Sequence, residues 1–155
     1  MDEISNAIRQ LKEEGRFFQL FSQEELALLF PYFGLVHYAA KAVIFAENEP
    51  TMVPLFVVVK GALEVNKKTD FGRPFVLAKI TRGALMGQVS LNSSPRVAPI
   101  TAVALEDTEL LMMSADRITE LLERHPVIGI KILKEIIRVQ NIRMLEMAER
   151  MTSSL

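Results

Sequence analysis

Arg96 is the residue whose surroundings most clearly require a chemical partner. The segment GALMGQVSLNSSPRVAPITA, residues 83–102, places this single arginine between two apolar runs. A guanidinium among apolar residues needs an anionic partner, because an unpaired charge is costly away from water. Two interpretations are open: Arg96 anchors an anionic ligand, or it forms a structural ion pair with Glu106 or Asp107.

The other reactive side chains do not form a catalytic or metal-binding set. His37 and His125 are the only two histidines and the chain has no cysteine, which argues against a metal site. Ser93 and Ser94 have no neighbouring histidine and are typical of a turn. Adjacent glutamates in the predicted helices point apart, so they form solvated faces and no acid–base pair. The sequence therefore predicts no enzyme, no metal and no cofactor.

Composition favours one cytoplasmic domain. The chain has 155 residues, 50% of them hydrophobic and 24% charged, with a formal net charge of -1. This charge balance argues against binding to DNA or another polyanion. The N-terminus is acidic and amphipathic, unlike a signal peptide, and no apolar run reaches the about 20 residues that a bilayer crossing needs. We therefore expect no membrane partner.

The order of predicted elements is helix, strands, helix within a single domain, residues 1–155. A helical segment covers 1–35, where Ser22 and Glu25 form a capping box. Short β-rich runs separated by turns cover 36–114 and predict a β-sandwich or roll. Helices cover 115–155, with Ser114 as a cap and Pro126 at the first position of a long last helix.

The last helix carries two apolar stripes. The first is a heptad seam with one polar member, and it consists of Ile130, Leu133, Ile137, Gln140, Met144, Met147 and Met151. The second consists of Ile128, Ile132, Ile136, Val139 and Ile142. One stripe can pack on the domain, and a symmetric homodimer would cover the other. The alternative is that both stripes are buried inside one domain.

Several segments, in order along the chain, resemble the cyclic-nucleotide-binding domain family, the sensor half of catabolite-activator-like regulators. They are LFSQEELALLFPYF, AVIFAENEP, LFVVVKGALEV around Gly61, and RGALMGQVSLNSSPRVAPITA, which is similar to the family's phosphate-binding cassette. In AVIFAENEP, Asn48 stands where the family usually has glycine. The resemblance implies a mostly β fold with flanking helices: an antiparallel double-stranded β-helix (a jelly-roll-like β-roll), N-terminal helices and a long C-terminal dimerisation helix.

The resemblance also implies a set of ligand-binding residues. They are Gly87, Gln88, Val89, Ser90, Arg96, Val97, Ala98 and, on the last helix, Arg143. Backbone N–H groups at the start of a short helix and the Arg96 guanidinium would bind a cyclic phosphate. Gln88 replaces the family's glutamate, which costs on the order of 1–3 kcal/mol, or about 10–100-fold in affinity. Arg143 could stack on a purine.

Two functional hypotheses follow from this resemblance. In the first, the chain is a regulatory module that binds cyclic AMP, cyclic GMP or a related phosphate and signals through its last helix to an effector protein. In the second, the pocket is vestigial and the domain is a dimerising scaffold. No helix-turn-helix module follows the last helix in this sequence, so we expect no DNA binding.

Overall fold

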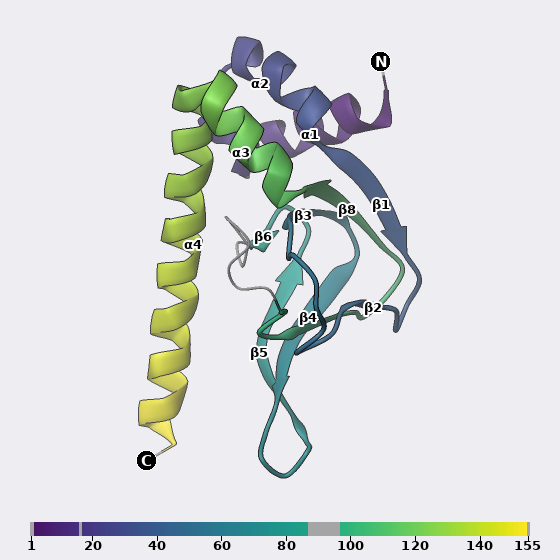
Figure 1. Cartoon of the computed structure of the whole chain (residues 1–155), viewed down its shortest axis with the longest axis vertical. Coiled ribbons are helices and arrows are strands. Elements are labelled where there is room, and N and C mark those ends of the chain that lie inside the picture. Colours follow the sequence, from purple (N-terminus) through teal and green to yellow (C-terminus); the bar gives the residue numbers. More distant parts are fainter. Residues whose placement is uncertain (1, 16, 87–96, 155) are drawn as a thin grey trace.

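Helices enclose a two-sheet β-roll at one end and along one side (Figure 1). The structure is a computed structural model that describes residues 2–15, 17–86 and 97–154. The described helices are α1 (Glu3–Glu13), η1 (Phe17–Leu20), α2 (Gln23–Leu29), η2 (Phe30–Tyr32), α3 (Ala115–Arg124) and α4 (Pro126–Ser153). The described strands are β1 (Gly34–Tyr38), β2 (Val43–Phe45), β3 (Leu55–Lys60), β4 (Ala62–Lys68), β5 (Pro74–Thr81), β6 (Leu85–Met86), β7 (Thr101–Ala104) and β8 (Thr108–Met113).

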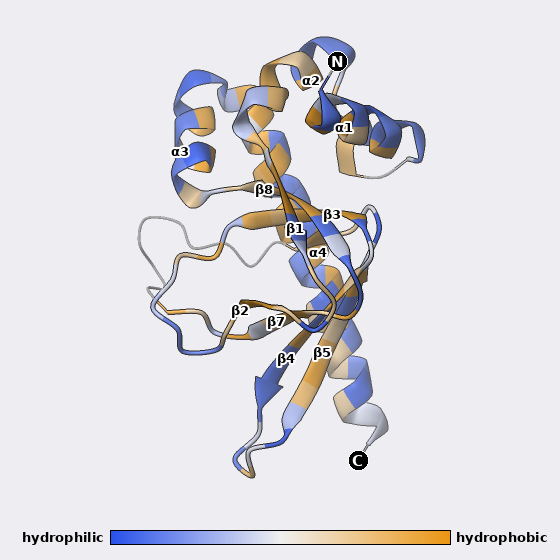
Figure 2. Cartoon of the chain, turned by 90° about the vertical axis from the view of Figure 1, so that its right-hand side faces the viewer, coloured by the Kyte–Doolittle hydropathy of each residue, from blue (hydrophilic) through white to orange (hydrophobic). Residues whose placement is uncertain are grey.

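The strands form two antiparallel sheets, each of four strands over the described residues. Their orders are β1-β8-β3-β6 and β2-β7-β4-β5. In Figure 2 the sheets form two layers, with β3 and β8 above β2 and β7. This architecture confirms the predicted β-roll with N-terminal helices and a long C-terminal helix.

Strand β3 is buried on both faces, which explains its unbroken apolar run. Leu55, Val57 and Val59 pack in the cluster beneath the helices, whereas Phe56 and Val58 pack between the two sheets. Successive side chains of a strand point to opposite faces, so one strand supplies both clusters. Strand β8 alternates in the same way. The helices therefore rest on the outer face of the sheet that β3 and β8 share.

The predicted helix starts are confirmed. Ser22 and Glu25 make the reciprocal bonds of a capping box at α2, and the Ser114 side chain accepts a hydrogen bond from the backbone of Arg117 at α3. Pro126 occupies the first turn of α4. These signals lie within one helical turn, so they form without help from the rest of the fold.

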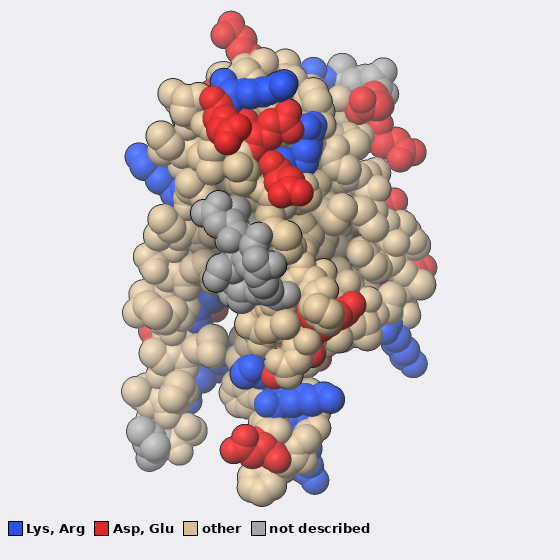
Figure 3. Space-filling view, viewed as in Figure 1, with Lys and Arg blue, Asp and Glu red and all other residues tan. Residues whose placement is uncertain are grey.

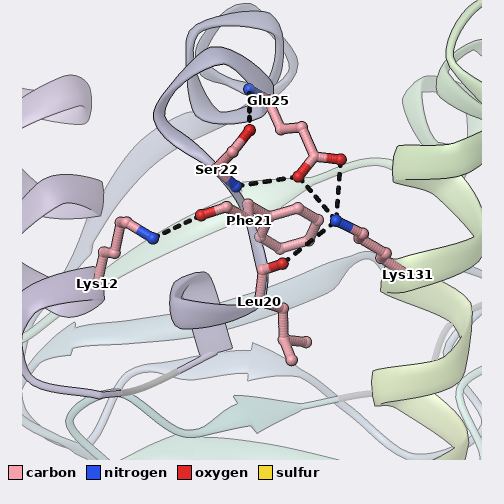
Figure 4. A network of polar contacts seen from close by, with 6 residues as sticks. All are labelled: Lys12, Leu20, Phe21, Ser22, Glu25 and Lys131. Carbon is pink, nitrogen blue, oxygen red and sulfur yellow. Dashed lines mark hydrogen bonds and ion pairs between the residues drawn. The ribbon is translucent and has the colours of Figure 1, made fainter.

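A lysine on α4 connects this long helix to the N-terminal segment (Figure 4). Lys131 Nζ donates to Glu25 Oε1 and Oε2 at 2.7 and 3.0 Å, and to the Leu20 carbonyl at 3.4 Å. The same carboxylate accepts the Ser22 backbone N–H. The hydrogen bond from Lys131, followed by the bond from Ser22, holds the pKa of Glu25 below its ordinary value. The start of α4 is thus held against α2.

Gly61 and Asn48 are among the turn residues with left-handed backbone conformations. Gly61 has a φ of 88°, and a Cβ added there would lie 2.5 Å from the Asp107 carbonyl oxygen and from Thr108 Oγ1. Only glycine fits that space without a shift of the neighbouring backbone. Asn48 has a φ of 67°, a conformation that asparagine tolerates better than most residues. This explains how Asn48 can occupy a turn where the related family usually has glycine.

The structure corrects two expectations about the elements. Strands β1 and β6 were not foreseen, because β1 has no strict alternation and β6 has only two residues. The heptad seam on α4 is split between two surroundings. Ile137 and Met144 are exposed, whereas Gln140 and Met147 line a cavity against the β-roll. The second stripe is split as well, because Ile128 and Ile132 are buried whereas Ile142 is exposed.

Candidate ligand-binding site

A small cavity lies between the β-roll and the middle of α4. Its volume is about 110 Å³. The lining residues from the β-roll are all apolar, and they are Val65, Leu77, Ala78, Ile80, Met86 and Ile100. Helix α4 contributes Gln140, Arg143 and Met147. The cavity thus combines apolar walls on β4, β5 and β6 with polar groups on α4, a composition suited to a ligand with both an apolar and a polar part.

Arg143 connects α4 to strand β6 at the edge of this cavity. Its Nη2 donates a hydrogen bond of 2.5 Å to the Leu85 carbonyl oxygen. Burial lowers the pKa of Arg143, and the nearby charge of Glu146 only partly opposes that effect. A partly buried guanidinium with a neutral acceptor keeps some capacity to bind an anion.

A second, larger cavity lies on the other side of Arg143. Its volume is about 380 Å³, and its walls come from the turn at 83–85, from α4 and from Gly15, Phe17, Gln19 and Leu20. The buried carboxylate of Glu135 lines it and accepts hydrogen bonds from Arg138 Nε at 3.0 and 3.1 Å. Because Glu135 is already paired with Arg138, Arg143 is the lining arginine that forms no ion pair among the described residues.

The end of α4 is attached to the edge strand β5. Strand β5 carries a bulge opposite β4 at Leu77. Arg150 donates to the Val76 and Leu77 carbonyl oxygens at 3.2 and 2.7 Å, and its guanidinium lies 5.8 Å from the centre of the Phe75 ring. A bulge leaves a backbone group without a strand partner, and Arg150 supplies the missing donor.

Most predicted ligand residues of the cassette lie outside the described part of the chain. They are Gly87, Gln88, Val89, Ser90 and Arg96. Of the remaining three, Val97 is 42% exposed, Ala98 is fully buried, and Arg143 lines the two cavities described above. The Ala98 backbone accepts the Asn48 N–H at 2.7 Å and donates to the Glu49 carbonyl at 2.9 Å. The segment that follows the cassette is therefore fixed to the turn that precedes β3.

Sequence reasoning did not identify the apolar lining of the cavity. Leu77, Ile80 and Met86 looked like ordinary core positions, because burial between sheets and burial against a ligand select the same residue types. Gln140 was accessible to prediction, since it is the one polar member of an otherwise apolar seam. Its neighbour Asn141 is exposed.

Metal-binding clusters and membrane-spanning helices are both absent from the described residues. Over residues 2–15, 17–86 and 97–154, no group of three or more His, Cys, Asp or Glu side chains could hold a metal ion. Within the same ranges, none of the helices combines the length and the hydrophobicity needed to cross a bilayer.

Solved structures of similar fold are sensor proteins and regulators. A cyclic nucleotide-binding domain from Methylobacillus flagellatus has a TM-score of 0.81 at 22% identity, covering 96% of this chain and 86% of that one. The Thermus thermophilus catabolite activator protein has a TM-score of 0.71 at 26% identity, covering 85% and 61%. The c-di-GMP responsive global regulator CLP of Xanthomonas campestris has a TM-score of 0.72 at 17% identity, covering 84% and 63%.

The sequence comparison agrees with the fold. No curated protein matches the chain significantly in sequence. The sequence model of the cyclic nucleotide-binding domain, however, matches residues 35–125, which is more than half of the chain and includes all eight described strands except the first residue of β1. This chain belongs to the cyclic nucleotide-binding domain family.

Proposed function

We propose that this chain is a regulatory sensor that binds a cyclic nucleotide or a related phosphate ligand and signals through α4. The observation that carries the proposal is the cavity between β4, β5, β6 and α4, where Arg143 is the charged lining residue. Strand β6 ends at Met86, directly before the predicted phosphate-binding residues, so the cavity and the cassette are neighbours in the chain. The role is regulatory rather than catalytic.

The size of the cavity suggests how the ligand would act. Pockets for small organic ligands usually exceed about 300 Å³, whereas this cavity holds about 110 Å³. A nucleotide would therefore fit only after the middle of α4 moves away from β6, while Arg150 keeps the end of the helix on β5. A ligand that binds better to the displaced arrangement shifts the population toward it. Ligand binding and the position of α4 are coupled for this reason.

The ligand would carry a phosphate and a ring system. Arg96 and the backbone around Gly87 would hold the phosphate, and the apolar walls would accept the base. Gln88 can accept one hydrogen bond from a ribose hydroxyl but supplies no charge. We therefore include cyclic AMP, cyclic GMP and a cyclic dinucleotide as candidates, the last because the Xanthomonas regulator of similar fold is c-di-GMP responsive.

The outer face of α4 would carry the signal by forming a homodimer. Its exposed large apolar side chains are Val127, Ile130, Ile137, Ile142, Met144, Leu145 and Met151. The face of α4 visible in Figure 3 carries few charged side chains. An apolar strip of this length on a helix is typical of a helix-to-helix interface. A shift of α4 would alter that interface and the surface offered to an effector protein.

A dimerising scaffold with a vestigial pocket is the second candidate. The small cavity and the neutral Gln88 favour it, because both reduce affinity for a cyclic phosphate. In that case the outer face of α4 would bind its partner without any ligand.

Titration calorimetry with cyclic AMP, cyclic GMP and a cyclic dinucleotide separates the two functions. We expect about micromolar binding of one of them, and loss of that binding in Arg96→Ala. The matched control is Arg150→Ala, which removes an arginine of the same chain outside the cavity and should leave affinity unchanged. Absence of heat from all three at about millimolar ligand would refute the sensor and support the scaffold.

A further inference from the structure

Arg143, like Arg150, contacts the β-roll through neutral backbone carbonyl oxygens, and it is the more buried of the two. Arg82, Arg117 and Arg138 each form an ion pair with a carboxylate. Arg143 donates instead to a neutral backbone carbonyl, and among the described residues no carboxylate lies within ion-pair distance of it. Burial also removes part of its hydration. A partly buried guanidinium that donates to a neutral carbonyl is stabilised less than one that is paired with a carboxylate.

The acceptor of Arg143 lies at a sensitive point of the chain. Leu85 starts the two-residue strand β6, which pairs with β3 through only Phe56 and Val57. The side chains around the Arg143 guanidinium from β4, β5 and β6 are apolar and provide no competing anion. The bond between Arg143 and Leu85 is therefore a polar tie between the middle of α4 and this short strand.

We propose that Arg143 is an anion-operated tie: its guanidinium holds the Leu85 carbonyl in the ligand-free protein and transfers to the anionic group of the ligand on binding. The proposal rests on the proposed function and names the contact that regulates the same site. It assigns Arg143 to the phosphate rather than to stacking on a base. The transfer releases β6 from the middle of α4, while Arg150 continues to hold the end of the helix.

The transfer is favourable because the two acceptors differ in charge. A phosphate oxygen accepts a shorter and stronger hydrogen bond from a guanidinium than a neutral carbonyl does, and it can accept two in parallel. The partial burial of Arg143 reduces screening by salt, which increases this difference. The same argument predicts little effect from an uncharged ligand of similar shape, such as adenosine.

Hydrogen–deuterium exchange on the full chain tests the tie. We expect Arg143→Gln without ligand to increase exchange several-fold in peptides covering residues 83–86 and 139–147. Saturating cyclic nucleotide should produce the same increase in the unsubstituted protein, and its affinity should fall at least about tenfold in Arg143→Gln. The control Arg150→Gln loses comparable carbonyl bonds at the helix end. It should increase exchange only near residues 147–154 and leave affinity unchanged.

Inorganic pyrophosphate serves as a second anionic probe in the exchange experiment, so the role of Arg143 can be tested even if no cyclic nucleotide binds. If no cyclic nucleotide binds but pyrophosphate increases exchange at residues 83–86 relative to sodium chloride of equal ionic strength, the proposed function fails and the tie stands. The tie is overturned if Arg143→Gln exchanges like the unsubstituted protein. It is also overturned if Arg143→Gln binds nucleotide with full affinity, or if neither nucleotide nor pyrophosphate changes exchange. Arg143→Lys, which retains the charge, should recover part of the nucleotide affinity.

Discussion

The same substitution on the two faces of α4 should affect two different properties of the protein. Ile132 is fully buried against the helical core, whereas Ile137 is 59% exposed on the outer face. Replacing either isoleucine with alanine removes the same atoms. We predict that Ile132→Ala destabilises the fold and that Ile137→Ala weakens the homodimer.

The magnitudes follow from exposure. Burial of each methylene is worth about 0.8 kcal/mol, so the atoms lost in isoleucine to alanine are worth about 2.4 kcal/mol when fully buried. Multiplying by the 59% of Ile137 that a partner could cover leaves about 1.4 kcal/mol per protomer. A two-fold interface counts the residue twice, which makes about 3 kcal/mol, or roughly a 100-fold rise in the dimer dissociation constant. For Ile132→Ala the cavity left behind brings the loss of folding free energy to about 3–4 kcal/mol.

Sedimentation equilibrium measures the dimer dissociation constant of Ile137→Ala, and urea unfolding measures the folding free energy of Ile132→Ala. Unfolding must be compared at one protein concentration, because dimerisation also stabilises the folded chain. The reasoning is refuted if Ile137→Ala dimerises like the unsubstituted protein, or if Ile132→Ala unfolds at the same urea concentration. An unsubstituted protein that is monomeric at every concentration would refute the homodimer itself.

Two further perturbations test the turn at Gly61 and the ion pair between Glu25 and Lys131. Gly61→Ala should lose about 3 kcal/mol of unfolding free energy, because a left-handed φ and a Cβ 2.5 Å from the Asp107 carbonyl oxygen both oppose it. A Cβ at Gly129 would meet chiefly the end of the Leu122 side chain, so Gly129→Ala should cost less free energy of unfolding. Urea unfolding measures both losses, and equal losses would contradict the turn argument. Glu25→Gln should destabilise the protein near neutral pH. Because the folded pKa of Glu25 is lowered, that stability is present above the ordinary value of 4.5 and is lost as pH falls below it, so the two urea curves should converge in acid. A difference that persists in acid would show that the Lys131 bond is not its source.

Local features of the fold were predictable because the interacting residues are close in the chain. The capping box of Ser22 and Glu25 spans three residues, and its geometry hardly depends on what packs above it. The continuous apolar run of β3 predicts that this strand is buried on both faces. Strand β6 could not be foreseen, since two residues carry no periodicity and its pairing with β3 depends on the whole roll.

The candidate site was predictable only in part. The arginine and glycine of the cassette stand out as residue types, but nothing local places Arg143 against Leu85, 58 residues earlier in the chain. The apolar walls were equally hidden, because Ile80 and Met86 have the sequence signature of any core residue.

The amino-acid sequence by itself determined the helix–strand–helix order of the chain, the strands other than β1 and β6, the helix starts and the family, because these depend on periodicity, capping and short motifs. Only the tertiary structure decided which side of α4 meets the β-roll. Both stripes of that helix are apolar, so hydrophobicity alone cannot choose between them. The choice follows from ties that act across the fold: Lys131 to Glu25, Arg143 to Leu85, and Arg150 to the bulge of β5. They turn Gln140 and Met147 toward the cavity and leave the opposite face of the helix open.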